Sequence, residues 1–160
     1  MKKVILPEAL ALLVLAGIMA LLLMKKTPAD VPLSEIKERL TSQFTPEEME
    51  EAGDMRLKRA FSLNAADFDE YIYFAPDNTM SVNEFLLIKC SDESRIPEIL
   101  GAFENRLAVQ KKNFEGYGTD QTALLNAAVT GSEGSYVWFI VGQDADAWLK
   151  AVKSAWEVKK

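Results

Sequence analysis

The distribution of apolar residues predicts a strand followed by a long helix in the middle of the chain. Four consecutive apolar residues, Phe85–Ile88, are typical of a strand covered on both faces. The apolar residues after them recur every three or four positions, which is the spacing of one helix face. They are Ile96, Ile99, Leu100, Phe103, Leu107 and Phe114. We expect this helix to begin near Ser94, with Pro97 in its first turn, and to end at Gly116 in a left-handed conformation.

The central strand and a later apolar segment are each expected to belong to a β-hairpin. Glu70–Ala75 is rich in aromatic and β-branched residues, and the turn-forming residues 76–78 separate it from the central strand. The second hairpin would join residues 128–129 to Tyr136–Val141 through a turn over Gly131–Gly134. Paired strands separated by helices favour the α+β class. We therefore predict an antiparallel sheet of two hairpins packed against the long helix and a C-terminal helix.

Shorter helical patterns surround these hairpins. Thr45–Glu48 has the sequence of a capping box and predicts a short helix that Gly53 ends. Asp54, Thr119 and Asp144 are each expected to cap a further helix. The apolar positions that the shorter helices would bury are Leu33, Ile36, Leu40, Leu57, Phe61, Leu124, Leu125, Ala145, Trp148, Leu149, Val152, Ala155 and Trp156.

The first part of the chain is a nearly continuous apolar segment. Residues 4–24 are interrupted only by Pro7 and Glu8, and both suit the first turn of a helix near the lipid headgroups. A helix from Pro7 to Met24 would be roughly 27 Å long, close to the thickness of a bilayer core. We therefore predict an N-terminal transmembrane helix, with a membrane anchor over residues 1–26, a stiff linker over 27–32 and an α+β domain over 33–160.

A cleaved signal peptide is the alternative interpretation of this segment. Two lysines precede the apolar core, and Thr27–Ala29 contains small residues of the kind found at a cleavage site. Lys25 and Lys26 directly after the core, and Pro28 within that site, favour retention as a signal anchor. Lysines flank the core on both sides, so local charge does not determine on which side of the membrane the domain lies.

The composition excludes several kinds of chemistry. The chain has no histidine and a single cysteine, so histidine-based catalysis and an intrachain disulfide are impossible, and a zinc site would need carboxylate ligands alone. An apolar fraction of 49% in 160 residues suits one domain with a real core, and a formal net charge of −6 disfavours nucleic acid as a partner. Because there is also no phosphate-loop lysine, dinucleotide fingerprint or serine-centred elbow, we predict no cofactor and no metal site.

One thiol and three carboxyl groups are the candidates for catalysis. Cys90 would need a base or a positive neighbour to act as a nucleophile, and a single cysteine in a strand is more often a small core residue. Glu84, Glu115 and Asp120 would support acid–base chemistry if two of them converged. The sequence does not determine their separation, so we predict no catalytic residue and favour a protein that is not an enzyme.

The segment Phe114–Gln121 has the composition of a binding turn. Two glycines flank Tyr117 ahead of a helix start, where free backbone N–H groups can bind an anion. Since Glu115 and Asp120 would repel an anion, a tight turn with a packed tyrosine explains the glycines at least as well. Tyr117, Asp120 and Gln121 are our candidate binding residues in this turn.

Aromatic residues of the strands form a second candidate binding surface. Tyr71, Tyr73 and Trp138 fall at alternating strand positions and predict an aromatic patch on one face of the sheet. Aromatic side chains are enriched in binding hot spots. The alternative is that the N-terminal helices cover these rings as a second layer of core.

Several motifs along the domain resemble a known family. They are NEFLLIKCSD from Asn83 on, Arg106, Leu107 and Gln110 in the long helix, the spacing Phe114, Tyr117, Asp120 and Gln121, and the strand YVWFIV. Together they resemble the domain-of-unknown-function family numbered four-three-five-eight, found mainly in Gram-positive bacteria. The resemblance implies an extracytoplasmic domain behind a signal, a lipoprotein signal or an anchor, and it implies no known activity. This chain has no cysteine for lipid attachment directly after its apolar segment, so the helix itself would be the anchor.

These observations together predict a single-pass protein of the cell membrane whose domain lies outside the cytoplasm. We expect it to act as a binding or assembly module for a protein or a component of the cell envelope. The alternative is a small carboxylate-based hydrolase at the envelope. A cleft that holds two carboxylates would favour the hydrolase, and an exposed aromatic face would favour binding.

Overall fold

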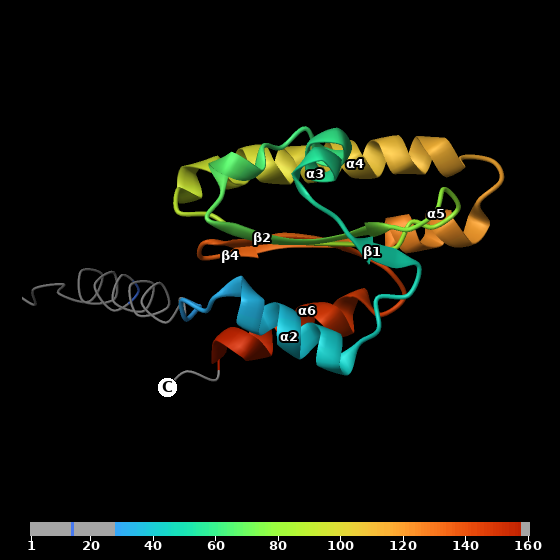
Figure 1. Cartoon of the computed structure of the whole chain (residues 1–160). Coiled ribbons are helices and arrows are strands. Elements are labelled where there is room, and N and C mark those ends of the chain that lie inside the picture. Colours follow the sequence, from blue (N-terminus) through green and yellow to red (C-terminus); the bar gives the residue numbers. More distant parts are fainter. Residues whose placement is uncertain (1–13, 15–27, 158–160) are drawn as a thin grey trace, which may run out of the picture.

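An antiparallel sheet forms the middle layer of the domain (Figure 1). The computed structural model describes residue 14 and residues 28–157. The five strands in this part of the chain are β1 (Met49–Glu51), β2 (Glu70–Pro76), β3 (Glu84–Lys89), β4 (Val129–Glu133) and β5 (Tyr136–Val141). Their order in the sheet is β1-β2-β3-β5-β4, and every neighbouring pair is antiparallel. Both predicted hairpins, β2–β3 and β4–β5, are therefore confirmed.

Helices cover both faces of this sheet (Figure 1). One face packs against α2 (Leu33–Gln43) and α6 (Ala145–Glu157). The other packs against α3 (Asp54–Phe61), α4 (Ile96–Phe114) and α5 (Thr119–Asn126). The predicted α+β class is confirmed, and the domain has three layers because β2, β3 and β5 carry apolar residues on both sides.

The alternation of side chains along the strands divides the core into two halves. Ile72, Leu87 and Trp138 are neighbours across β2, β3 and β5, and all three lie on the α2–α6 side. The adjacent row, Tyr73, Leu86 and Phe139, lies on the α3–α4 side. Leu87, Phe103 and Trp148, which the apolar pattern predicted to be core residues, are all buried.

The helix predicted from Thr45–Glu48 is wrong. In its place the chain turns at Glu48, which has a positive φ of 55°, and continues as the edge strand β1. Met49, Glu50 and Glu51 pair with Pro76, Ala75 and Phe74 of β2. Pairing with the exposed edge of β2 satisfies the backbone of this segment, which a capping motif of four residues could not do alone.

The start of α4 and the turn of the second hairpin also differ from the prediction. A 3₁₀ turn, Glu93–Arg95, precedes α4, and the side chain that caps this turn is Asp92 in place of Ser94. Gly116 has φ 86° after the helix, as predicted. Gly131 lies within β4, and the turn falls later, at Gly134 with φ 54°. Gly131 is needed there because a Cβ atom would lie 2.9 Å from Cζ2 of Trp138.

The described part of the predicted linker packs on the domain. Val31 is fully buried, its backbone N–H donates to the hydroxyl of Tyr136 at 2.9 Å, and that hydroxyl lies 2.9 Å from the carbonyl oxygen of Val31. These residues therefore hold the chain against the start of β5 and do not act as a free spacer. The predicted membrane anchor lies outside the described residues, apart from Val14. Within residues 28–157, no helix has both the length and the apolar character needed to cross a bilayer.

Candidate functional site

A polar groove lies between α3, α4 and the loop that joins β2 to β3. Its volume is about 470 Å³, which is in the range of small-molecule sites. Helix α3 contributes Arg56 and Arg59, and the β2–β3 loop contributes residues 77–79 and Ser81. We call this hollow the α3–α4 groove.

Helix α4 supplies the longest wall of the α3–α4 groove. The wall consists of Arg106, Gln110 and Asn113, and Tyr117 extends it beyond the helix end. These positions are spaced by four, three and four residues, so they share one side of the helix. Phe103, about two turns before Gln110 on the same side of the helix, lies in the core, where it contacts Phe61 and Phe139 edge-on.

A buried carboxylate lies behind the wall of this groove. Glu84, the first residue of β3, is 1% exposed. The Arg106 guanidinium donates to both of its oxygens, from Nε at 3.0 Å and from Nη2 at 3.2 Å. The hydroxyl of Tyr73 donates a third hydrogen bond at 2.6 Å. This arrangement joins β2, β3 and α4 through one charged group.

Burial controls the ionisation of this cluster. Burial raises the pKa of the Glu84 carboxyl above its usual range, and the ion pair and hydrogen bonds with Arg106 oppose that rise. Burial, and then the nearby charge of Glu84, also raises the pKa of the Tyr73 hydroxyl. The tyrosine therefore stays protonated and serves as a donor.

The structure brings three of the predicted binding residues to this region. Tyr73 and Tyr117 line the α3–α4 groove. Gln121 donates from Nε2 to the carbonyl oxygen of Met80 at 3.2 Å, which ties α5 to the β2–β3 loop. Asp120 is exposed on the first turn of α5 and does not line the groove. Ligand contacts by these residues stay a prediction.

The predicted aromatic patch on a single sheet face is wrong in its geometry. Tyr73 and Trp138 lie on opposite faces, and both are buried, beneath α3–α4 and α2–α6 respectively. Since β3 lies between β2 and β5, the pairing register and not the alternation within each strand decides which rings share a face. Tyr71 is half-buried, and its hydroxyl donates to Asp54 at 2.5 Å.

The groups considered for catalysis are not gathered in one place. Cys90 is buried, and burial raises the pKa of its thiol. Glu115 and Asp120 are exposed in the turn after α4 and at the start of α5, whereas Glu84 is buried and paired with Arg106. Among the described residues, no group of three or more acidic or cysteine side chains could hold a metal ion.

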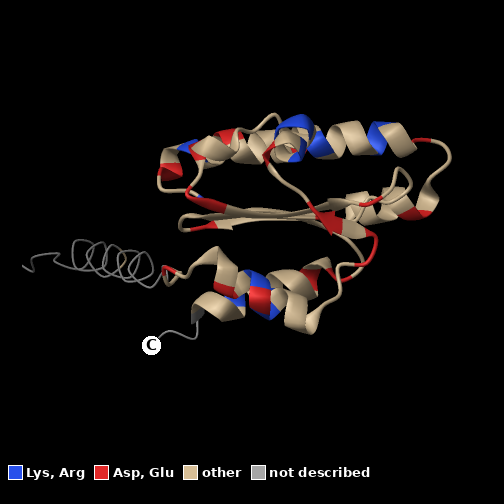
Figure 2. Cartoon of the chain, in the orientation of Figure 1, with Lys and Arg blue, Asp and Glu red and all other residues tan. Residues whose placement is uncertain are grey.

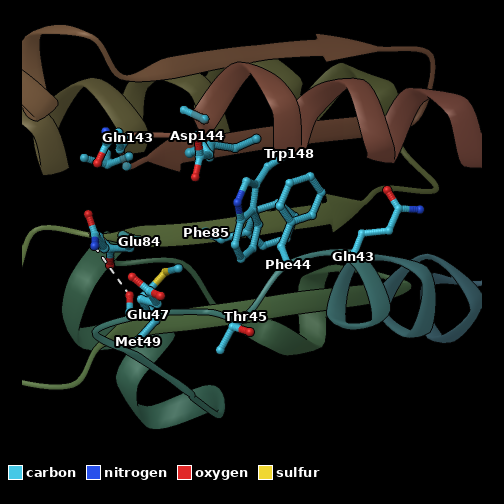
Figure 3. A pocket seen from close by; sticks show the side chains of 15 residues that line it. Gln43, Phe44, Thr45, Glu47, Met49, Glu84, Phe85, Gln143, Asp144 and Trp148 are labelled. Carbon is cyan, nitrogen blue, oxygen red and sulfur yellow. Dashed lines mark hydrogen bonds between the residues drawn. The ribbon is translucent and has the colours of Figure 1, made fainter.

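A second hollow, of about 290 Å³, lies at the same end of the sheet on the α2–α6 side (Figure 3). Figure 3 shows the rings of Phe44 and Trp148 side by side, with centroids 5.4 Å apart. Asn83 Nδ2 donates to the carbonyl oxygen of Glu47 at 3.4 Å. The exposed atoms of this hollow belong mainly to the segments before β1 and before α6.

Comparison with known families identifies the domain. The sequence model of the family described as "Domain of unknown function (DUF4358)" matches residues 42–142. The chain belongs to the DUF4358 family. The DUF4358 match spans all five strands, α3, α4 and α5, and it therefore contains every residue of the α3–α4 groove. A search of curated proteins and a search of solved structures found no match.

The sequence interpretation missed the polar side of α4 and the pairing of Glu84. Gln110 interrupts the apolar stripe seven residues after Phe103, with Arg106 and Asn113 beside it, and this is a signal that the sequence does contain. Glu84 at the start of an apolar strand is a second signal, because a charge in a buried strand requires a partner. The identity of that partner, 22 residues later in the chain, is not a local property.

Proposed function

We propose that this DUF4358 protein is a binding module that its N-terminal apolar segment holds at the membrane, with the domain on the extracytoplasmic side. The observation that supports binding is the α3–α4 groove. Its lining includes Arg59, Gln110 and Tyr117, side chains that recognise ligands through hydrogen bonds, charge and aromatic contact.

The position of the groove relative to the linker supports this proposal. Val31 is held at Tyr136, which pairs with Lys89 at one end of β3. The β2–β3 loop, which borders the groove, lies at the other end of the strands (Figure 1). A strand as long as β3 spans about 20 Å. A bilayer at the linker end would leave the groove facing away from the membrane and accessible to a partner.

The alternative function, a carboxylate-based hydrolase, requires two carboxylates that exchange protons with a substrate. The partners of Glu84 are instead a guanidinium and a phenol, and they occupy both of its oxygens. This pairing is better suited to fixing the wall of a binding groove, so we favour binding.

Protease treatment of intact protoplasts tests the membrane arrangement. We expect the domain to be cleaved from outside while the full-length chain remains in the membrane fraction before treatment. A protected domain would contradict the extracytoplasmic side, and a mature N-terminus near Asp30 would contradict the anchor.

Site-specific crosslinking tests binding at the groove. A photoreactive residue at Tyr117, which is 65% exposed on the groove wall, should give a discrete adduct in native membranes. The matched control is the same residue at Lys150, which is exposed on α6 beyond the other face of the sheet. Equal adducts at both positions, or none at Tyr117, would contradict a partner in the groove.

A further inference from the structure

We infer that the α3–α4 groove holds a small molecule by one anionic group, a carboxylate or a phosphate. This inference rests on the proposed binding function and specifies the chemistry of its ligand. It depends on three features of the groove: the charge of its two helices, a side-chain amide that lines the groove without a protein partner, and hydrogen-bond donors that lack acceptors.

The two helices that form the groove carry an unusual concentration of positive charge. Residues 55–61 of α3 and 105–114 of α4 contain no acidic residue and six of the chain's 18 lysines and arginines. They are Arg56, Lys58, Arg59, Arg106, Lys111 and Lys112. Figure 2 shows Lys and Arg on α3 and on the C-terminal half of α4. Within residues 28–157, this local excess of positive charge attracts an anion.

Most of these cations have no carboxylate partner. Among the described residues, five lysines and arginines form no salt bridge, and four of them, Lys58, Arg59, Lys111 and Lys112, are on α3 and α4. The fifth is Lys150 on α6. The other described lysines and arginines pair with acids, as Lys89 does with Asp30. Of the four unpaired cations on α3 and α4, Arg59 lines the groove, and its guanidinium is available to a ligand there.

Gln110 provides the second, independent observation. Its side chain is only 7% exposed, it lines the groove, and it has no hydrogen-bond partner within the described part of the chain. Its amide atoms are not among the fully buried polar atoms of the described residues that lack a partner, so they reach the solvent of the groove. An amide directed into a groove of this size is explained if a ligand completes its hydrogen bonds.

The other groups around Gln110 include hydrogen-bond donors without acceptors. Arg106 uses Nε and Nη2 for Glu84, and its Nη1 has no acceptor among the described residues. Ser81 is 5% exposed, and its hydroxyl oxygen accepts from the N–H of Asn83, which leaves the hydroxyl proton to donate. The lining also contains one acid, Asp77, which accepts from Asn78 at 2.6 Å and keeps its negative charge. Donors without acceptors, beside unpaired arginine, match the oxygens of a carboxylate or phosphate.

Titration with small anions tests this inference. The full chain, labelled with ¹⁵N and held in micelles of a neutral detergent, is titrated with inorganic phosphate and with succinate at constant ionic strength, and the side-chain amide signal of Gln110 is followed. We expect a saturable shift with at least one anion. Glycerol should cause none. Shifts that stay linear with concentration for both anions would overturn the inference.

Charge-matched variants locate the effect in the groove. Arg59→Gln removes an exposed, unpaired cation at the groove, and Lys150→Gln removes one on the opposite side of the domain. We expect Arg59→Gln to weaken anion binding about tenfold, the loss of one charge-assisted hydrogen bond, and Lys150→Gln to leave it unchanged. Equal weakening by both variants would overturn the inference, because it would indicate attraction by overall charge alone.

A third variant examines this side-chain amide itself. Gln110→Met keeps the size of the side chain and removes its hydrogen-bonding groups, so we expect wild-type thermal stability and binding at least about tenfold weaker. A folded Gln110→Met protein with wild-type affinity would overturn the role of Gln110. If neither anion binds while the adduct at Tyr117 persists, the anionic ligand is wrong and the proposed binding function stands.

Discussion

Glu84 connects the sheet to the groove, because it lies in β3 and pairs with Arg106 of the groove wall. A carboxylate at the start of a buried strand is costly unless its oxygens are hydrogen-bonded. Arg106 and Tyr73 supply three donors from α4 and β2. The same guanidinium lies 5.8 Å from the centre of the Phe61 ring, so the pair is also fixed by packing against α3.

Replacing Arg106 by methionine should destabilise the fold strongly. It would leave Glu84 buried without its counter-charge, and we expect the free energy of unfolding at pH 7 to fall by about 3 to 5 kcal/mol. Urea denaturation measures this loss. The control is Arg95→Met, whose partners Asp67 and Glu98 are on the surface, and which should cost much less because surface ion pairs contribute little to stability. Equal losses would mean that the Glu84–Arg106 pair is not a buried ion pair.

The same variant should show a characteristic pH dependence. Burial raises the folded-state pKa of Glu84 above its unfolded value, so its contribution to stability is largest below the unfolded pKa and declines as the pH rises through the folded pKa. Without Arg106 the pKa should rise further. The difference in unfolding free energy between Arg106→Met and the wild type should therefore be smaller at pH 5 than at pH 7, and a constant difference would contradict this account.

Two glycines with opposite surroundings allow a test of packing at β4. Gly131→Ala would bring a Cβ atom to 2.9 Å from the Trp138 ring, and we expect a loss of about 1 to 3 kcal/mol together with a change in tryptophan fluorescence. At Gly101 in α4 a Cβ atom meets nothing within 4 Å. Gly101→Ala should therefore stabilise the domain by about 0.5 to 1 kcal/mol, as expected inside a helix. The interpretation of Gly131 fails if both substitutions change the free energy of unfolding in the same direction.

At the scale of elements, the buried stripe of α4 also reaches the groove. Ile99, Phe103 and Phe114 of this stripe lie in the core. Gln110, seven residues after Phe103, belongs to the same stripe, and it lines the groove together with the adjacent Arg106. The helix can serve both purposes because its apolar stripe occupies only part of its circumference. Its packing on the sheet therefore determines the shape of the groove wall.

Truncation of the apolar side of α4 should be costly. Phe103 is 1% exposed and contacts the rings of Phe61 and Phe139, so we expect Phe103→Ala to lower the free energy of unfolding by about 3 to 5 kcal/mol. Val109→Ala, at an exposed position of the same helix, is the control and should change it by no more than about 0.5 kcal/mol. A thermal midpoint within a few degrees of wild type for Phe103→Ala would refute the assigned packing.

At the scale of the whole molecule, the contact between Val31 and Tyr136 determines how the domain is attached to whatever precedes it. The two residues are 105 positions apart in the sequence. The Tyr136 hydroxyl accepts a hydrogen bond from the backbone N–H of Val31 and donates one to the backbone carbonyl oxygen of Val31. Tyr136 also stacks on Trp156 of α6, with ring centroids 4.7 Å apart. The linker, β5 and α6 therefore form one unit at the end of the sheet away from the groove.

Removal of one hydroxyl should loosen this attachment. Tyr136→Phe leaves the N–H of Val31 buried without an acceptor, and we expect a loss of about 1 to 3 kcal/mol and faster hydrogen exchange at that amide. Tyr71→Phe is the control, because its hydroxyl bonds to the exposed Asp54 and lies far from the linker in sequence. Unchanged exchange at Val31 in Tyr136→Phe would show that packing alone holds the linker.

The local sequence pattern was sufficient for most of the elements of this fold. β3 is a short, continuous apolar run, and the apolar residues of α4 and α6 recur every three or four positions. Each pattern covers only a few residues, so the local sequence is enough to predict the type of element. The same reasoning identified both hairpins and the α+β class. It also showed that histidine cannot act in catalysis, because the sequence contains none.

Tertiary structure alone decided the features that join distant segments. The edge strand β1, the opposite faces of Tyr73 and Trp138, the Glu84–Arg106 pair and the docking of Val31 all depend on which segments become neighbours in space. A local pattern shows that a side chain must be buried, but not against which partner, because register and layer order are set by contacts summed over the whole core. The α3–α4 groove arises in the same way, where three segments meet.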